Sequence, residues 1–480
     1  MSKDLRTFLK GYEAKYSEDI LHIEKEISAD QETTAIVARL EKQDKYPILH
    51  FHNVLTPEGK KTNAPVVTNV LASRTRSARI CNSTFQTLGR DIARATRTKK
   101  KKPLVIKQNE APVQEVVKTG DKINLYEFPV LKHNALDAGL YFSSGFLITY
   151  DPDSGIDNCA LMRGWILEKD KVRVQIAGTM HNGMNLHKHN LRNQDMKVAY
   201  WLGHHPLGYI GGLAKLPYPG SHWEAMGGML DEPLRVVPSV SLGDDFLVPA
   251  DAEVIVEGIL EANKVYPEGP FGEFPRYFGG QMLNPQIEVT AVTHRKDAIW
   301  YDIVPGWADH QGTGGPALEG QLWDSLKPRF SSLQNVYMPL SGTGRFHAYL
   351  QFEDPGPTDA RQAIVMAVML NPGLIKHAFA FNDDVDIFNE KEVMWAIATR
   401  SQWDKDVIVI PRTKVGSLDP SAGLAGENAV GGLDCTIPWN ESYEEKVYVN
   451  PEILNRTKLK DYVSEEALAA VQIDRAQEED

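Results

Sequence analysis

The chain has 480 residues, of which 42% are hydrophobic and 24% charged, and it carries a formal net charge of −12. This length predicts two or three domains, and the composition excludes a fibrous or disordered protein. The acidic balance disfavours a general nucleic-acid binder but leaves room for local basic pockets that take an anionic substrate.

No stretch reaches the roughly 18 apolar residues of a membrane helix, and the charged N-terminus lacks the apolar core of a signal peptide. Three cysteines, Cys81, Cys159 and Cys435, are widely spaced and odd in number, which fits neither a CxxC metal site nor a disulfide framework. We therefore expect a cytoplasmic protein with no membrane partner and no nucleic-acid partner.

The N-terminal portion is predicted to open with a helix over residues 4–20, because Leu5, Phe8, Leu9 and Tyr12 recur at helical spacing. Short strands and helices follow to about residue 98. The basic stretch 97–103 then favours a solvated linker over a polyanion-binding patch. We assign residues 1–112 to an N-terminal α/β portion.

The sequence pattern changes over residues 113–330, where short segments of alternating apolar and polar residues are separated by Gly, Pro and Asp. This pattern predicts an antiparallel sheet or barrel. Residues 331–450 alternate strand-like and helix-like segments, which is typical of a small α/β domain. The tail, residues 451–480, is charged and helix-prone, and it suits packing against a neighbouring subunit.

The segment from residue 158 to 181 predicts a hairpin that turns near Lys169 and Asp170. In that register Asn158 faces His181 directly, at the short spacing of opposed residues, and the pair could share an ion. With a carboxylate added, such ligands favour Mn²⁺ or Mg²⁺, although a cross-strand Asn–His pair is also a common surface contact. Strict alternation points Arg163 to the other face unless a bulge intervenes.

Residues 267–280 (PEGPFGEFPRYFGG) form an acidic loop stiffened by proline and tightened by glycine. Glu268 and Glu273 lie beside Phe271 and Phe274, whose apolar side chains would raise a glutamate pKa and fit it for proton transfer. An ordinary solvent-exposed loop is the alternative interpretation.

Taken together, these segments resemble the UbiD-like decarboxylases, a prenylated-FMN-dependent family, over most of the chain. DCTIPW and DVDIFN resemble the aromatic, hydroxybenzoate-type branch most closely. The motifs that carry the resemblance are DLRTFL (4–9), Asn158 followed by Arg163 and His181, VPADAE (248–253) with Glu257-Gly258, EGPFGE (268–273), DDVDIF (383–388), WAIATR (395–400) and GGLDCTIPW (431–439).

The resemblance implies a prenylated FMN whose phosphate is bridged to the protein by Mn²⁺ or Mg²⁺, with K⁺ as a further candidate cation. In this family the third metal ligand is a glutamate that precedes a small-residue pair ending in glycine. Aligning that pair with the two glycines of this chain puts Trp223 at the ligand position. Since Trp cannot ligate a metal, we assign Glu224. Several members carry a lysine shortly before the glycine that precedes the dipeptide LD. The corresponding stretch of this chain, residues 428–431, has no lysine. The implied cofactor contacts are Asn158, Leu161, Met162, Arg163, Met180, His181 and Glu224, and the implied metal ligands are Asn158, His181 and Glu224.

The implied reaction is the reversible, non-oxidative decarboxylation of an aromatic, heteroaromatic or α,β-unsaturated carboxylic acid through a covalent adduct with the flavin. The implied catalytic trio is Arg163, Glu268 and Glu273. We expect Glu273 to donate the proton, while Arg163 neutralises the substrate carboxylate and keeps Glu268 ionised. His310 is the candidate substrate contact, as an imidazole that accepts a phenol or N–H proton, although a surface loop histidine is as reasonable an interpretation.

The implied fold is α+β, with a central flavin-reductase-like split β-barrel flanked by the N-terminal α/β portion and the C-terminal α/β domain. The implied partners are a small carboxylic acid, a flavin prenyltransferase that supplies the cofactor, and further copies of the chain in a homodimer or hexamer. Two rival functions stay open: an ordinary FMN oxidoreductase or ester hydrolase, and a non-catalytic flavin-binding or assembly subunit.

Overall fold

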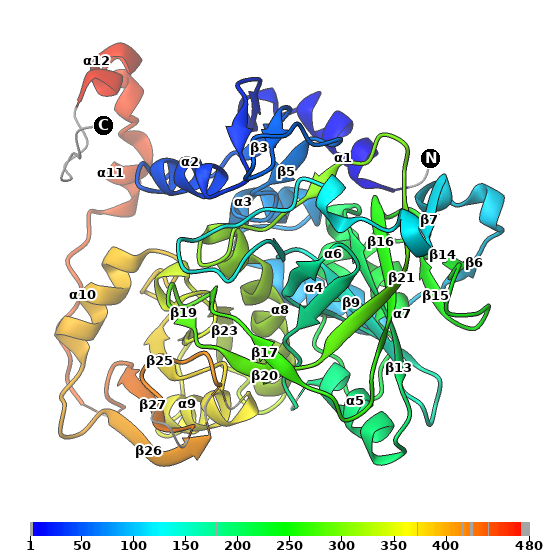
Figure 1. Ribbon diagram of the computed structural model, residues 1–480. Helices are drawn as coiled ribbons and strands as arrows, with labels where there is room; N and C mark the ends of the chain where they lie inside the picture. The colour runs from blue at the N-terminus through cyan, green and yellow to red at the C-terminus, as the bar shows by residue number, and fades with distance from the viewer. Residues whose placement is uncertain are drawn as a thin grey trace. The chain divides into compact units, whose positions relative to one another are not determined.

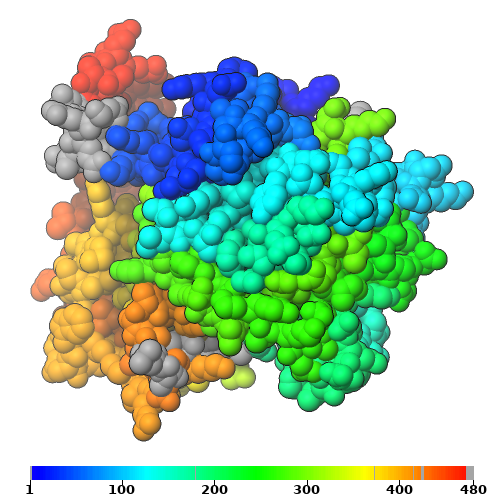
Figure 2. Space-filling model, in the orientation of Figure 1, coloured from blue at the N-terminus to red at the C-terminus, as the bar shows by residue number. Residues whose placement is uncertain are grey.

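The computed structural model describes residues 3–178, 180–371, 373–414, 416–422, 426–439 and 441–471. The chain divides into two compact units, Met1–Thr436 and Ile437–Asp480. Every strand of the described residues lies in the first unit. In the space-filling view its N-terminal residues, in blue, and its central residues, in cyan and green, form one continuous face (Figure 2).

The N-terminal helix α1 runs from Leu5 to Glu13 and ends earlier than the sequence predicts. Its four apolar residues are all buried, as their helical spacing predicts. Asp4 caps it: the carboxylate accepts from the Thr7 backbone N–H at 2.8 Å, and the Thr7 hydroxyl accepts from the Asp4 N–H in return.

A small mixed sheet follows α1, with the strand order β1–β3–β5–β22. Its last strand comes from far along the sequence, so the N-terminal portion is built partly from the end of the central region. The strands of this sheet are β1 (Ile20–Ile23), β3 (Ile48–Phe51), β5 (Val66–Thr68) and β22 (Trp300–Tyr301), with a separate parallel ribbon of β2 (Ile27–Ser28) and β4 (Val54–Leu55). The helices are α2 (Glu32–Glu41), α3 (Arg74–Ile80) and α4 (Leu88–Thr98).

The basic stretch after α4 is not a free linker, contrary to expectation. Arg97 pairs with Asp324 at 2.7 Å, and Lys101 pairs with Asp231 at 2.6 Å. The Lys101 backbone N–H also donates to the carbonyl of Glu224. These contacts fix the stretch against the helices on either side, so its charges are partly neutralised within the fold.

The central region is one nine-stranded sheet with the order β10–β9–β13–β16–β21–β12–β11–β8, and β7 pairs with β21 beside β12. It curls into an open half-barrel (Figure 1). Its strands are β7 (Val116–Thr119), β8 (Tyr141–Phe142), β9 (Phe146–Tyr150), β10 (Asp157–Leu161), β11 (Gly164–Glu168), β12 (Lys171–Val174), β13 (Met196–Leu202), β16 (Val254–Leu260) and β21 (Gln286–His294).

Shorter elements surround this sheet. A three-stranded sheet joins β6 to the central region, and two small ribbons carry the acidic loop. These strands are β6 (Leu104–Val105), β14 (Arg235–Pro238), β15 (Leu247–Pro249), β17 (Tyr266–Glu268), β18 (Phe271–Gly272), β19 (Phe278–Gly279) and β20 (Met282–Asn284). The helices are α5 (His181–Leu191), α6 (Pro206–Gly212) and α7 (His222–Leu230).

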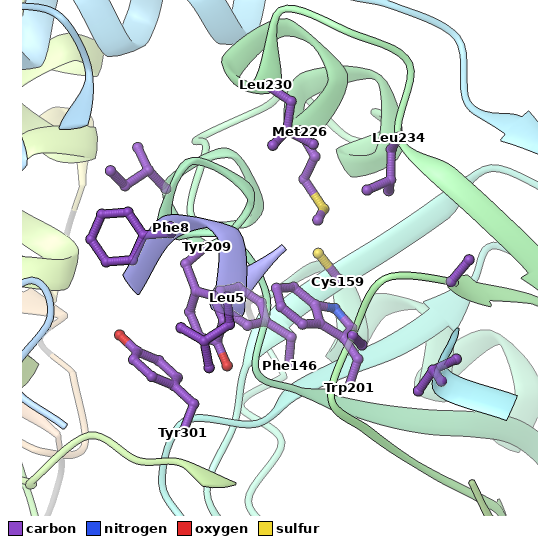
Figure 3. Packing of buried hydrophobic residues seen from close by; sticks show 14 of the residues in the cluster. Leu5, Phe8, Phe146, Cys159, Trp201, Tyr209, Met226, Leu230, Leu234 and Tyr301 are labelled. Carbon is purple, nitrogen blue, oxygen red and sulfur yellow. The ribbon is translucent and has the colours of Figure 1, made fainter. Parts of the chain in front are cut away.

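Both faces of the curled sheet are buried, because successive side chains of a strand point to opposite faces. On β9, Phe146 and Ile148 belong to one apolar cluster, whereas Leu147 belongs to the other. In the first cluster the rings of Phe146 and Trp201 stack with centroids 4.5 Å apart, and Tyr209 packs edge-on against both (Figure 3). Burying side chains of this size stabilises the fold by about 1.5–3 kcal/mol each.

The C-terminal part of the first unit combines a β-sheet with helices. Its five-stranded sheet has the order β23–β24–β25–β27–β26, in which the three central strands are parallel. Its elements are α8 (Ala308–Leu326), β23 (Leu333–Tyr337), β24 (His347–Phe352), α9 (Asp359–Leu370), β25 (His377–Asn382), α10 (Glu390–Arg400), β26 (Val407–Lys414) and β27 (Glu427–Cys435).

Two of the sequence motifs are joined to others by partly buried ion pairs. Arg6 of DLRTFL bonds both oxygens of Glu253, in VPADAE, at 3.2 Å. Arg400 of WAIATR bonds both oxygens of Asp384, in DDVDIF. These motifs therefore hold distant parts of the first unit together, since removing one partner would leave an uncompensated charge in a largely buried position.

The second unit contains two short helices, α11 (Pro451–Arg456) and α12 (Glu465–Ala470). Its apolar side chains are exposed throughout the described residues, among them Val447 at 97% and Tyr462 at 73%. Among the residues that the structure describes, no helix combines the length and the apolar character needed to cross a membrane.

Candidate active site

Arg163 lies where the two ends of the curled sheet meet. β10 is the first strand in the sheet order and β11 the last but one, yet only Met162 and Arg163 separate them in sequence. The break is fixed by two bonds: the Met162 N–H donates to the Gly145 carbonyl at 3.0 Å, and the Tyr200 hydroxyl donates to the Arg163 carbonyl at 3.3 Å. A break in the strand, rather than the expected bulge, thus positions the guanidinium.

The acidic loop brings both of its glutamates to this guanidinium. Arg163 Nε and Nη2 donate to Glu268 at 3.0 and 2.7 Å, and Nη1 donates to Glu273 at 2.5 Å. Glu268 is fully buried, and Arg163 and Glu273 are each 7% exposed. The alternative of an ordinary exposed loop is therefore wrong for these two carboxylates.

The two glutamates have unequal surroundings. Glu268 also accepts from the Tyr141 hydroxyl at 3.1 Å and from Asn284 Nδ2 at 3.0 Å, so with the two Arg163 bonds it accepts from four donors. Glu273 accepts only from Arg163 among the described residues. Burial raises the pKa of Glu273 above its usual value, and the nearby Arg163 guanidinium offsets part of that rise.

Glycine lets the β18–β19 ribbon approach the arginine closely. A Cβ added at Gly279 would lie 3.3 Å from Arg163 Nη1 and 3.5 Å from Glu273 Cγ. Gly269, whose φ of +92° favours glycine, lies on the other side, where a Cβ would be 3.4 Å from Arg163 Nη2. The guanidinium also faces the Phe271 ring at 5.3 Å.

A second wall comes from α8 and the C-terminal domain. His310, on the first turn of α8, has its ring 6.3 Å from that of Phe274, and the Arg345 guanidinium lies 4.1 Å from the Phe274 ring centre. Burial lowers the pKa of Arg345 to about 10, against the opposing effect of Glu273. Burial also lowers the pKa of His310 well below its usual value, with Arg345 adding to the effect.

The neutral His310 ring is oriented differently from what we expect. Its Nδ1 accepts from the Gly306 backbone N–H at 3.3 Å. The proton of the neutral ring is therefore on Nε2, which leaves that atom as a hydrogen-bond donor. The expectation of an imidazole that accepts a proton does not fit this tautomer.

The predicted pairing of Asn158 with His181 across one hairpin is wrong. The hairpin exists, since β11 pairs with β12, but Asn158 pairs with Thr149 of β9. His181 begins α5 because the chain has left the sheet after Val174. The error follows from assuming one unbroken strand where the chain breaks at Met162.

Asn158 is nevertheless tied to the helix that His181 begins. Asn158 Nδ2 donates to Asn182 Oδ1, which ties β10 to the start of α5, next to His181. Asp157 accepts from the Trp223 N–H at 3.0 Å and from the Ser221 hydroxyl, which ties β10 to the start of α7. Three elements thus converge where an amide, an imidazole and a carboxylate are available.

At the start of α7, the two candidates for the third metal ligand, Trp223 and Glu224, have different surroundings. Trp223 is 2% exposed, and its Nε1 donates to the Tyr150 hydroxyl at 3.3 Å, so it belongs to the core. Glu224 is half-buried, and no side-chain partner is recorded for it in the described part of the chain. His222 lies with its ring 6.2 Å from that of His181, and burial lowers its pKa to about 3.

The remaining predicted cofactor contacts lie around this corner. Leu161 packs half-buried against one apolar cluster, and Met162 is 6% exposed in the other. Met180 precedes α5 and is 38% exposed. Alternation along the chain separates Leu161 from Met162, so the two side chains face different environments.

Several residues of the site have no signature in the sequence. Tyr141 and Asn284 looked like ordinary strand residues. Arg345 and Lys215 lie in segments that carry no motif. Burial lowers the pKa of Lys215 to about 8, with Arg345 adding to the effect, and Lys215 in turn contributes to the lowered pKa of His181.

Three family domains match the chain in order: the 3-octaprenyl-4-hydroxybenzoate carboxy-lyase N-terminal domain over residues 13–96, the Rift-related domain over 105–308 and the C-terminal domain over 312–435. Together they cover most of the fold and every residue of the candidate site except His310, which lies between the second and third matches. The chain is thus a carboxy-lyase, that is, a decarboxylase.

Individual relatives agree with this class. An anhydromevalonate phosphate decarboxylase from Methanothermobacter thermautotrophicus is 26% identical over 90% of this chain and 97% of its own length. A phenolic acid decarboxylase from Escherichia coli is 29% identical over 69% and 70% of the two chains. The UbiD-class enzyme HmfF from Pelotomaculum thermopropionicum, solved with FMN, has a TM-score of 0.87 and 29% identity, over 96% of this chain and all of that one.

An evolved dimeric form of HmfF, solved in complex with prFMN, gives a TM-score of 0.85 at 29% identity. The neighbours therefore bind a flavin in the fold that this chain shares. The chain belongs to the UbiD family of decarboxylases.

Proposed function

We propose that this chain decarboxylates an aromatic, heteroaromatic or α,β-unsaturated carboxylic acid, reversibly and without net oxidation, with prenylated FMN as cofactor. The observation that carries the proposal is the buried Arg163, which is bonded to two carboxylates with unequal hydrogen-bonding surroundings. A paired acid and base around one guanidinium suit a reaction that binds a carboxylate and protonates the carbon it leaves.

The residues at the start of α5 and α7 fit a divalent metal. The Asn158 amide donates to Asn182, and no donor is directed at its own Oδ1 within the described residues, so this oxygen is available to a cation. His181, kept neutral by burial, and the unengaged Glu224 complete a set of one nitrogen and two oxygens. Such a set suits Mn²⁺ or Mg²⁺, with K⁺ as a further candidate.

Lys215 fits the phosphate of the flavin. Its ammonium is half-buried without a carboxylate partner in the described residues, which costs free energy unless an anion binds. Its charge contributes to the lowered pKa of His181, and the charge of Arg345 contributes to its own lowered pKa, so Lys215 is within electrostatic range of both groups. Lys215 would then compensate for the lysine missing before Gly431.

The bound flavin would supply an electron sink for the charge left on carbon when CO₂ departs, which no side chain can provide. Arg163 holds the substrate carboxylate and keeps Glu268 ionised. Glu273, with its raised pKa, carries the proton that replaces CO₂. The apolar rings of Phe271 and Phe274 exclude water from these groups.

The substrate wall favours a planar acid with a further acceptor or anionic group. Phe274 offers an aromatic face, His310 an Nε2–H donor, and Arg345 a cation without an ion-pair partner in the described residues. An aromatic or heteroaromatic acid with a second oxygen substituent suits all three. A phosphorylated unsaturated acid would use Arg345 but not the aromatic face.

The wider assignments belong to the same proposal. They are a flavin-reductase-like split barrel for the central sheet, a cytoplasmic location, cofactor supply by a flavin prenyltransferase, and a homodimer or hexamer. The free thiols of Cys81, Cys159 and Cys435 are compatible with a reducing compartment.

The test is co-expression with a flavin prenyltransferase, anaerobic purification, and mass and absorbance spectra of the extracted cofactor. The parent, Glu273→Gln and the control Glu288→Gln should all contain prenylated FMN, whereas Asn158→Ala should lose it. Release of CO₂ from a panel of phenolic, heteroaromatic and phosphorylated unsaturated acids should fall about 10²–10⁴-fold in Glu273→Gln only.

Each contrary result identifies a rival. Bound cofactor without CO₂ release from any acid would indicate a flavin-binding or assembly subunit. NAD(P)H-dependent turnover would indicate an FMN oxidoreductase. No prenylated flavin in any sample, with an active prenyltransferase present, would refute the proposal.

A further inference from the structure

Three histidines lie together in the N-terminal sheet, far from the acidic loop in sequence. β1 and β3 pair in parallel with His22 opposite His50. His52 follows β3 two residues after His50, so the alternation of a strand puts both on one face. Parallel pairing and alternation together thus bring the three imidazoles to one side of the sheet.

The rings are close enough to share an ion. One ligand nitrogen from each lies within 4.8 Å of the others. His22 Nδ1 and His52 Nε2 are 2.9 Å apart, and the ring centres of His50 and His52 are 4.1 Å apart. Small ring rotations would bring all three nitrogens to about 2.0–2.1 Å from one cation.

One further observation indicates that the cluster is prepared for a ligand. His50 Nε2 is buried and has no hydrogen-bond partner in the described residues, which is costly for a polar atom. A cation would satisfy this atom.

We propose that His22, His50 and His52 form a second metal site, for a late first-row divalent ion of the Zn²⁺ type. Glu13, the last residue of α1, accepts from His22 Nε2 at 2.8 Å. This bond fixes the tautomer that leaves His22 Nδ1 free to ligate, as outer carboxylates do for zinc-bound histidines. Glu24, whose Oε1 lies 3.5 Å from His52 Nε2 and whose side chain is 77% exposed, would rotate towards the three rings to supply a fourth ligand.

The donor set separates this site from the metal corner of the active site. Three imidazoles and one carboxylate favour four-coordinate Zn²⁺. The amide and carboxylate oxygens around Asn158 favour Mn²⁺ or Mg²⁺. The two sites also share no element, because the histidines come from β1 and the end of β3, with Glu13 from α1, whereas the active-site candidates come from β10, α5 and α7. The second site therefore does not depend on the proposed decarboxylase function.

The ion would cross-link secondary-structure elements of the N-terminal portion. It would join β1 to β3 directly and α1 through Glu13, at the edge of the sheet where β1 has β3 as its one strand neighbour in the described residues. Binding to the folded state alone raises stability by mass action. Zn²⁺ should therefore raise the melting temperature of the parent protein.

The test uses Co²⁺ as a spectroscopic substitute for Zn²⁺, titrated into the full-length, chelator-treated protein. Four-coordinate Co²⁺ absorbs much more strongly in the visible range than six-coordinate Co²⁺. The parent should develop the strong spectrum with one equivalent and lose it on addition of Zn²⁺. His22→Asn and His52→Asn should bind one ion fewer and lose the spectrum, while His187→Asn, which removes a lone exposed histidine, should retain it.

Glu13→Gln provides a finer test, since it keeps the shape of the side chain. It should retain the spectrum but weaken Co²⁺ binding about 10–100-fold. Decarboxylase activity and circular dichroism should match the parent in all four variants, which separates loss of the ion from loss of the fold. The proposal is overturned if the parent gives no four-coordinate spectrum, or if His22→Asn and His52→Asn bind Co²⁺ as the parent does.

Discussion

At the scale of single residues, two arginine guanidinium groups act on Glu273. Arg163 bonds it directly, and Arg345 lowers its pKa from a greater distance. If protonated Glu273 is the active form, the rate falls as pH rises through its pKa. Since burial raises that pKa, the alkaline limb should lie above the usual glutamate range.

Replacing Arg345 by Met should shift the alkaline limb of the pH profile to still higher pH. Removing the positive charge destabilises ionised Glu273, so the pKa rises and activity persists to higher pH. The measurement is the pH dependence of kcat/KM, with Arg361→Met as a control, because Arg361 lies elsewhere in the C-terminal domain and bonds the Lys405 carbonyl. A limb that moves to lower pH, or does not move, would contradict the assignment of Glu273.

Lys215 offers a second test of a single charge. Lys215→Met should lower the flavin retained per chain about tenfold or more, since a charge-assisted bond to phosphate contributes roughly 1.5–3 kcal/mol. Lys197→Met is the control, because Lys197 is exposed and only 3.4 Å from Asp245. Flavin content would be measured by absorbance after denaturation. Equal content in the two variants would exclude Lys215 from the cofactor site.

The sequence could predict only part of this site. Glu268 and Glu273 lie in one short motif, so a local pattern was sufficient to single them out. Arg345 and Lys215 come from segments far away in the chain, and their role depends on burial beside other charges. A sequence without coordinates contains no signal for such burial.

At the scale of elements, the β18–β19 ribbon determines how closely the loop approaches Arg163. Gly279→Ala should lower kcat about tenfold, because the new methyl would press on Arg163 Nη1 and on Glu273. Gly280→Ala is a matched control one residue away, where a Cβ would meet nothing within 4 Å. Steady-state kinetics and melting temperatures would be compared for both.

Both substitutions should leave the melting temperature nearly unchanged, since neither glycine has a positive φ. Equal kcat values for the two variants would mean that the fit of the ribbon is unimportant for the reaction.

The prediction of elements succeeded where local periodicity decides and failed where the chain breaks. The four apolar residues of α1 lie where helical spacing predicts them, and the alternating segments of residues 113–330 form the predicted antiparallel sheet. The hairpin turn near Lys169 was also correct. The register beyond it was wrong, because the break at Met162 depends on a bond to Gly145 in another strand. Long-range bonds of this kind leave no periodic pattern.

At the scale of the whole molecule, the family resemblance was sufficient to predict a mixed fold of helices and strands. The order of strands was not predicted. β22 joins the N-terminal sheet, and β10 and β11 lie at or beside opposite ends of the central sheet although they are neighbours in sequence. This crossing is what places Arg163 between the sheet ends, so the site is a consequence of topology rather than of any one motif.

The second unit, Ile437–Asp480, gives the last prediction. Its exposed apolar side chains include Val447, Leu459 and Tyr462, and a monomer rarely exposes so many together. We expect them to bury against another copy of the chain.

Ending the chain after Thr436 should therefore lower the molecular mass measured by light scattering from that of an oligomer to that of a monomer. Ending it after Val471 is the control, because it keeps these side chains and should keep the oligomer. Since every described strand precedes residue 437, the shorter chain should retain its circular dichroism spectrum. An unchanged oligomer in the shorter chain would assign the subunit contact to the first unit instead.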